Sequence, residues 1–322
     1  MTLKKQVFAG LFGLVSLTAF AQDFTESGDH SANLANLNYY PHQGHFLLSP
    51  RVTSSISDQN STTNEDSNPT GVSTVAFFRG DLPISYGLLP GLRIGISENE
   101  LFNSESTHTV GNSRATSFSK SSGLSDPTFS TAYRYFEDDA RSGLSGDVAV
   151  SASPSWVSHQ VSSPTQDGSN GKGYGTLSAA LPFYLWKSKN EVELSPAITH
   201  QYVGNGVGVD PTSSFTRGST SFETVTVNDR LHLTSNASVQ GGLLLNFPYN
   251  TQTTTLDSSM TVRTTQLPFY VTPRVNFEYL FRSNVLFDVE YDYFNYTTTV
   301  VETLSSNKNI ESTLAFRFLI EI

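Results

Sequence analysis

The chain has 322 residues and no cysteine, and its 19 basic side chains against 29 acidic ones give a net charge of −10. The acidic balance argues against a nucleic-acid partner, because binding to nucleic acid depends on neutralising phosphates with Lys and Arg. The absence of cysteine excludes disulfides and a lipid-modified cysteine, and no Gly-rich phosphate loop follows a strand, so we expect no cofactor.

The first 21 residues predict a cleaved signal peptide. Lys4 and Lys5 form a basic start, residues 7–17 are apolar, and an Ala-x-Ala ending is completed by Ala21. These are the three parts of a secretory signal. The apolar run is too short to span a membrane as a helix, which takes about 20 residues. We therefore expect export to the envelope of a Gram-negative bacterium.

The segment after the signal, residues 22–44, is expected to lie in the periplasm or in the lumen of the domain that follows. It contains the stretch "PHQGH", with His42 and His45. Two histidines without a carboxylate or cysteine partner are weak evidence for a metal site, so we predict none.

Residues 45–322 predict an all-β domain of about twelve strands. Alternation of apolar and polar residues places the strands at 45–57, 72–88, 92–103, 125–136, 143–157, 173–186, 191–203, 219–233, 237–248, 262–279, 285–298 and 310–322. Short separators alternate strictly with longer polar ones, such as 59–71, 103–124 and 158–172. An even number of strands with short turns at one end and long loops at the other is typical of a closed antiparallel transmembrane β-barrel, with the short turns in the periplasm.

The faces of the strands support a barrel. In 262–279, one face carries Phe269, Val271, Pro273, Val275, Phe277 and Tyr279, and the other carries Tyr270, Thr272, Arg274, Asn276 and Glu278. The last strand, which reads "STLAFRFLIEI", alternates in the same way and is expected to pair with the first, since an unpaired edge is not tolerated in lipid. Aromatic residues near strand ends predict interface girdles: Tyr133, Tyr135, Trp156, Trp186, Tyr249 and Tyr296.

Asp229 conflicts with this pattern, because it falls on the expected lipid face of 219–233. A charge in the bilayer is costly, so we expect a bulge or a different register there.

The stretches "GLSDPTFSTAYRYF" (123–136) and "GDVAVSASPSW" (146–156) resemble the outer-membrane proteins named for a MetA pathway of phenol degradation, a family of transporters. The Gly-x-x-Asp-Pro motif and the late proline of the second stretch carry the resemblance. It implies a channel for small aromatic or hydrophobic molecules and assigns no role to particular residues.

We do not expect an enzyme. Outer-membrane phospholipases use a Ser–His pair with an Asn on neighbouring strands, and His159 and His200 are the candidates here. The first falls in a loop and the second on the lipid face, and neither has a clear serine partner at the required distance.

The charged residues that are expected to face the lumen are the candidate site. They are Arg134, Asp147, Arg274, Glu278, Asp288, Glu290, Asp292 and Arg317. Counting along the strands predicts a pair between Arg134 and Asp147, and one charged layer of Arg274, Glu290 and Arg317. Such charges either satisfy one another and close a narrow lumen or form a constriction that filters solutes.

The leading interpretation is an outer-membrane channel for passive passage of small solutes. The alternative is a structural or surface-interaction barrel with a plugged lumen, and a third is a secreted soluble β-sandwich. The expected partners are outer-membrane lipid, lipopolysaccharide and a small-molecule solute. The oligomeric state is left open, and twelve strands do not decide whether the lumen conducts.

Overall fold

The computed structural model describes residues 34–63, 71–110, 113–138, 142–157, 168–169, 173–202, 204–207, 214–248, 252–256, 261–300 and 305–322. The predicted signal peptide, His159 and Tyr249 lie outside these ranges. Within them, no helix is long and apolar enough to cross a membrane. The strands are β1 (Phe46–Leu48), β2 (Arg51–Thr63), β3 (Gly71–Leu89), β4 (Leu92–Val110), β5 (Ser113–Leu124), β6 (Thr128–Glu137), β7 (Ser142–Ser153), β8 (Gly168–Ser169), β9 (Thr176–Ala180), β10 (Phe183–Lys187), β11 (Asn190–Gln201), β12 (Gly204–Val207), β13 (Ser214–Arg217), β14 (Thr220–His232), β15 (Ala237–Pro248), β16 (Gln252–Leu256), β17 (Thr261–Gln266), β18 (Tyr270–Arg282), β19 (Val285–Val300) and β20 (Ser305–Glu321).

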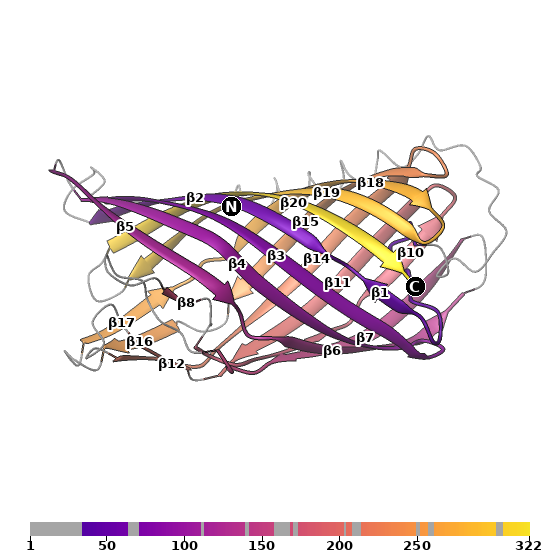
Figure 1. Cartoon of the computed structure of the whole chain (residues 1–322), viewed down its shortest axis with the longest axis horizontal. Helices are drawn as coiled ribbons and strands as arrows, with labels where there is room; N and C mark the ends of the chain where they lie inside the picture. Colours follow the sequence, from indigo (N-terminus) through magenta and orange to yellow (C-terminus); the bar gives the residue numbers. More distant parts are fainter. Residues whose placement is uncertain are drawn as a thin grey trace, which may run out of the picture.

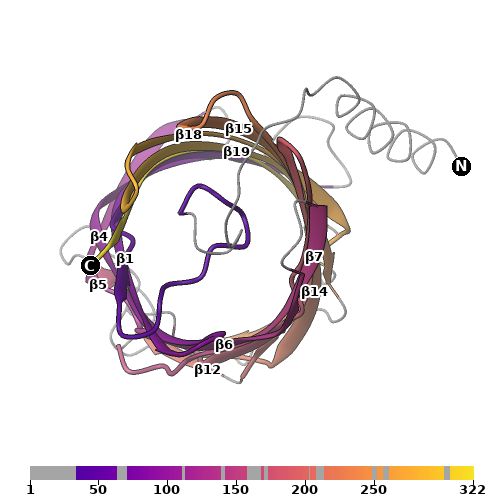
Figure 2. The same cartoon turned by 90° about the vertical axis from the view of Figure 1, so that its right-hand side faces the viewer.

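These segments form one closed ring (Figures 1 and 2). Apart from β8, which pairs in parallel with β5, they combine into twelve antiparallel strands of the described chain, seven of them split in two. The ring closes because β1 and β2 pair with β20 on one side and with β3 on the other. The twelve-stranded antiparallel architecture predicted from the sequence is confirmed.

Prolines explain four of the seven splits. Pro50, Pro127, Pro182 and Pro268 lie between β1 and β2, β5 and β6, β9 and β10, and β17 and β18. Proline has no amide hydrogen to donate to the neighbouring strand, so the ladder is interrupted there. Its carbonyl still accepts, as Pro182 does from the amide of Asp147 at 2.9 Å. Each pair of segments therefore continues as one strand across the break.

The two ends of the ring differ in their connections. Five short connections join strands at the end that we call the short-turn end: four turns at residues 90–91, 188–189, 233–236 and 283–284, and the connection from β6 to β7. At the other end, the long-loop end, several strands extend further than expected. Residues 103–124 were predicted as a long loop, but β4 continues to Val110 and β5 begins at Ser113. This hairpin extends beyond the apolar belt of the ring. Its residues are therefore mostly polar, and their composition is like that of a loop.

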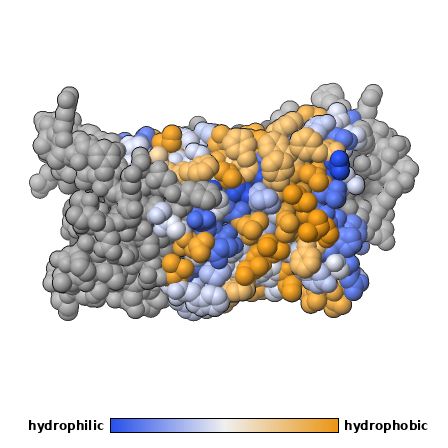
Figure 3. Space-filling model, viewed as in Figure 1, coloured by the Kyte–Doolittle hydropathy of each residue, from blue (hydrophilic) through white to orange (hydrophobic). Residues whose placement is uncertain are grey.

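Apolar side chains face outward and gather over the middle of the face shown in Figure 3. Tyr133 and Tyr135 lie on this outer surface near a short turn, as predicted. Trp186 and Tyr296 do not belong to an outer girdle. Trp186 is buried, and Tyr296 stacks on the inward-facing Tyr270 with ring centroids 4.5 Å apart.

The expectation of a bulge at Asp229 is wrong. The pairing of β14 with β11 and with β15 runs without interruption, and it places Asp229 between Val192 and Gly241. Asp229 therefore lies on the outward face of β14. It lies close to the turn at 233–236, where a charge costs less than at the middle of the bilayer.

Candidate functional site: the lumen of the ring

Charged side chains from β2, β18 and β19 form one linked set on the inner face. Arg274 donates from Nε to Asp292 over 2.8 Å, and the same nitrogen lies 3.7 Å from Glu290. Glu290 also accepts from Arg51, at 2.5 Å. Sequence reasoning did not select Arg51. It begins β2 and lies opposite Arg317 of β20, the strand next to β19, so its side chain can reach Glu290.

Arg317 lies at a different level from the one expected. The register places it opposite Asp288, and the two side chains form an ion pair. The structure does not bring Arg317 to Glu290. Alternation predicts the face of a side chain, but tilted strands shift its level around the ring.

Glu278 binds a further arginine that sequence reasoning missed. Arg230 of β14 donates to it over 2.5 Å, and the hydroxyl of Ser238 donates to its second oxygen over 2.9 Å. Arg230 follows the outward-facing Asp229 and therefore faces inward.

Arg134 and Asp147 form the predicted pair, on β6 and β7, with both side chains buried. The Nε of Arg134 donates to Asp147 over 2.8 Å, and its Nη1 lies 3.2 Å from Glu137. Its Nη2 donates over 2.6 Å to the carbonyl oxygen of Asn38. The pair thus also binds the segment that precedes the first strand.

This segment, residues 34–44, lies inside the ring near the short-turn end (Figure 2). The amide of Leu37 donates to Glu191 over 2.5 Å, and Arg230 donates to the carbonyl oxygen of Ala35. Asn38 is almost fully buried, and its side-chain amide donates to Glu137 over 3.2 Å. Charged groups of several strands therefore hold the segment in place.

Tyr40 fixes the middle of the segment. Its ring lies between the guanidinium groups of Arg93 and Arg134, which are 4.8 Å and 4.7 Å from the ring centroid. Its hydroxyl donates to the carbonyl oxygen of Ala132. Burial raises the pKa of Tyr40 to about 12, so the phenol keeps its proton and remains a donor at neutral pH.

An apolar cluster completes the contact at the short-turn end. Leu34, Ala35 and Tyr39 of the segment pack with Leu47 of β1 and Leu286 of β19. These inward-facing leucines lie next to the short turns, nearer to that end of the ring than the linked charged set of β2, β18 and β19. Polar contacts and apolar packing thus hold the same eleven-residue stretch.

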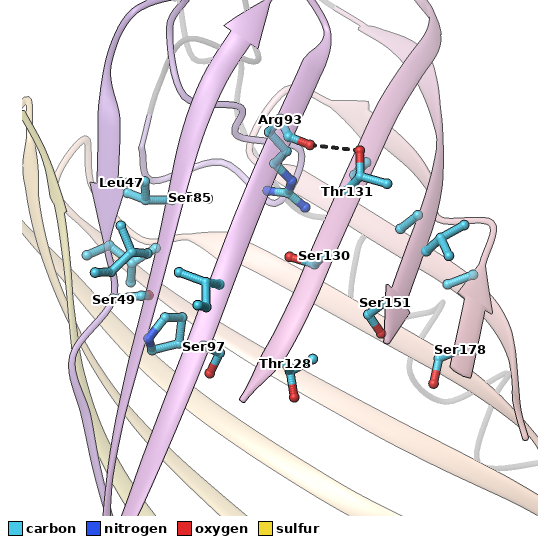
Figure 4. A pocket seen from close by; sticks show the side chains of 18 of the residues that line it. Leu47, Ser49, Ser85, Arg93, Ser97, Thr128, Ser130, Thr131, Ser151 and Ser178 are labelled. Atoms are coloured by element: carbon cyan, nitrogen blue, oxygen red, sulfur yellow. Dashed lines mark hydrogen bonds between the residues drawn. The ribbon is translucent and has the colours of Figure 1, made fainter. Parts of the chain in front are cut away.

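The wall formed by β3, β4, β6, β7 and β9 is different, because its inward side chains are small. A cavity of about 370 Å³ lies against this wall, bordered by Arg93 and Arg317 (Figure 4). Gly95, Ser130 and Ser151 lie in one row across neighbouring strands. The small inward-facing lining residues of these five strands are Ser85, Ser97, Thr128, Ser130, Ala132, Ala149, Ser151, Ser178 and Ala180.

The sequence analysis did not predict this cavity, because it selected only charged residues as candidates for the site. A signal was present: the inward positions of five successive strands carry mainly Ser, Thr, Ala and Gly. Small residues leave space where the opposite wall fills it with arginines and carboxylates. The lumen is therefore asymmetric, with one crowded charged wall and one open hydroxyl-lined wall.

The Ser–His geometry considered for an enzyme occurs on the outer surface. His200 Nδ1 lies 2.8 Å from the hydroxyl of Ser221. Both residues share the outward face of their strands with Ile198. This pair faces away from the lumen and its cavity.

A closed ring with an apolar belt outside and polar groups inside defines a transmembrane β-barrel. The chain is similar to the solved structure of an outer membrane channel from Pseudomonas putida F1, with a TM-score of 0.62 and 11% identity over 93% of this chain and 100% of that one. It is also similar to the transport unit of the autotransporter AIDA-I from Escherichia coli, with a TM-score of 0.53 and 11% identity over 89% of this chain and 94% of that one. At such identities the likeness concerns the fold alone.

No family model matches the chain, and no curated protein matches it. The resemblance to the phenol-degradation family therefore stays a prediction.

Proposed function

We propose that the protein is an outer-membrane channel for passive passage of small, weakly polar or aromatic solutes. The observation that carries the proposal is the cavity of about 370 Å³ against the small-residue wall, a volume within the range of small-molecule sites. Hydroxyl groups there can bind a polar substituent, while the alanines accept an apolar ring. The predicted signal peptide and the barrel fold support an outer-membrane location, with the short turns in the periplasm.

A second function is favoured by residues 34–44. Their hydrogen bonds to Glu191, Arg134 and Arg230 place polypeptide in the lumen at the short-turn end. A barrel in which this segment stays in place would be a structural or surface-interaction protein.

Transport measurements on the mature protein separate the two functions. We expect ionic conductance in planar bilayers, and swelling of proteoliposomes in phenols and small sugars faster than in larger sugars. A folded barrel that gives neither conductance nor swelling would contradict the channel and favour the plugged barrel.

The cavity itself is tested by filling it. Ser151→Trp places a large ring within the small-residue row, so we expect slower swelling, most of all with the largest solute that the wild type admits. Val148→Trp is the matched control, since Val148 lies on the same strand and faces outward, away from the cavity. Equal effects of the two substitutions would show that solutes do not pass along this wall.

A further inference from the structure

Residues 42–45 form a tight turn that brings two histidines together. The amide of His45 donates to the carbonyl oxygen of His42 over 3.0 Å, and Gly44 has a φ of +86°, which suits glycine. The two imidazole rings are 5.5 Å apart, centroid to centroid. The spacing in "PHQGH" thus places both rings on one side of the turn.

The turn is seated on β3 by close backbone contact. A Cβ on Gly87 would lie 2.2 Å from the carbonyl oxygen of His42, so only glycine admits this approach. The amide of Gly44 donates to Gly87 over 2.8 Å, and the amide of Gly87 donates to His45 over 3.0 Å. The backbone of both histidines is therefore held.

The last described strand supplies the carboxylate that the sequence alone did not pair with these histidines. Phe46 and Ile322 exchange two backbone hydrogen bonds of 2.8 and 2.9 Å, which hold Glu321 beside the turn. Its Oε1 lies 2.7 Å from Nδ1 of His42 and 3.6 Å from Nδ1 of His45. One ligand atom from each of the three residues lies within 4.8 Å of the others.

We propose that His42, His45 and Glu321 bind a Zn²⁺ ion. Two imidazole nitrogens and one carboxylate oxygen are a common zinc ligand set, in which a water molecule takes the fourth position. In a tetrahedron with bonds of about 2.0–2.1 Å, the ligand atoms lie about 3.3–3.4 Å apart. The separations of 2.7 and 3.6 Å from Glu321 Oε1 to the two histidine nitrogens lie on either side of this value.

Access and charge fit a metal that enters from solvent. The side chains of His42 and His45 are 49% and 52% exposed, whereas Glu321 is 9% exposed. A half-open site of this kind can exchange its ion. Imidazole nitrogen favours Zn²⁺ over Mg²⁺ and Ca²⁺, which prefer oxygen ligands.

The site joins parts of the molecule that are far apart in the chain. His42 belongs to the segment that lies in the lumen and His45 follows it directly, and the carboxylate belongs to β20, at the seam where the ring closes. A bound ion would add a link between the lumenal segment and this seam. We therefore expect Zn²⁺ to stabilise both.

The test is a Zn²⁺ titration of the untagged mature protein in detergent, against a competing chromophoric chelator. We expect one Zn²⁺ per chain, with affinity lowered in Glu321→Gln and in His45→Ala by more than the roughly 10–100-fold that loss of an outer-shell partner costs. His200→Ala, which removes a histidine from the outer face, should bind Zn²⁺ as the wild type does. Heat-modifiable gel migration checks that each variant is folded.

Two results would overturn the proposal. One is the absence of stoichiometric binding at micromolar Zn²⁺ in the folded wild type. The other is unchanged affinity in both Glu321→Gln and His45→Ala, which would place any bound ion elsewhere. Co²⁺ provides an independent reading, since the visible bands of a tetrahedral Co²⁺ site should appear in the wild type and weaken in His45→Ala.

Discussion

Asp126 shows how one residue of the Gly-x-x-Asp-Pro motif organises the long-loop end. Its side chain is 0% exposed, and its Oδ1 accepts hydrogen bonds from the backbone amides of Trp156 and Val157, both at 2.7 Å. It precedes Pro127, where β5 gives way to β6. The carboxylate thus ties this break to the end of β7, so the motif that carries the family resemblance has a structural role here.

Asp126→Ala should lower the free energy of unfolding by about 1.5–3 kcal/mol, because it removes a buried charged acceptor and leaves two partly buried amides unpaired. Urea unfolding in detergent, followed by tryptophan fluorescence, measures the loss. Asp138→Ala is the control, since Asp138 accepts from the amide of Leu144 in an exposed turn. Equal losses would mean that burial of the acceptor is unimportant.

At the scale of single strands, alternation predicted the faces well and the boundaries less well. In the predicted apolar row of 262–279, Phe269, Val275, Phe277 and Tyr279 are exposed on the outside of the ring, as expected. The extension of β4 and β5 was not predicted, because a strand beyond the bilayer has no apolar face to mark it. The position of Trp186 was predicted wrongly for a related reason. Near the end of a strand, an aromatic residue can lie either at the membrane interface or inside the lumen at the short-turn end.

Val275 lies at the centre of the outer row of β18, so Val275→Arg tests the lipid-facing surface. We expect a loss of about 2–4 kcal/mol in folding stability in lipid vesicles, as for a cation near the bilayer midplane. Ser178→Arg is the matched control, because Ser178 lines the cavity and an arginine there can be solvated. If Ser178→Arg lost as much folding stability as Val275→Arg, the surroundings of the inner and outer faces would be equally apolar.

For the molecule as a whole, the sequence predicted the closed ring, its strand number and the inward charges. It did not predict how the lumen is divided. The level of Arg317, the partnership of Arg51 with Glu290 and the contacts of residues 34–44 all depend on register and tilt. A pattern with period two contains no information on either quantity, since shifts of two residues leave every side chain on the same face.

Glu290 lies between two arginines, so neutralising it should change the ion preference of the lumen. Glu290→Gln leaves Arg51 and Arg274 with less compensation, and we expect the reversal potential in a salt gradient to shift towards anion selectivity. The shift should weaken at high salt. Glu223→Gln, which removes the same charge from the exposed outer face of β14, should leave the potential unchanged. A conducting Glu290→Gln barrel with the wild-type potential would remove these charges as the filter.

The closure of the ring also governs how the chain can fold. The strand that begins at residue 46 is paired with the one that ends at residue 321, so this seam brings together the most distant parts of the described sequence. Contacts of such sequence separation form slowly, because the entropy of closing a long loop is lost before the contact is gained. Until the seam forms, β2 and β20 present free edges on which another chain can add. This architecture therefore requires that the unfolded chain be escorted to the membrane and that its two edge strands join rapidly.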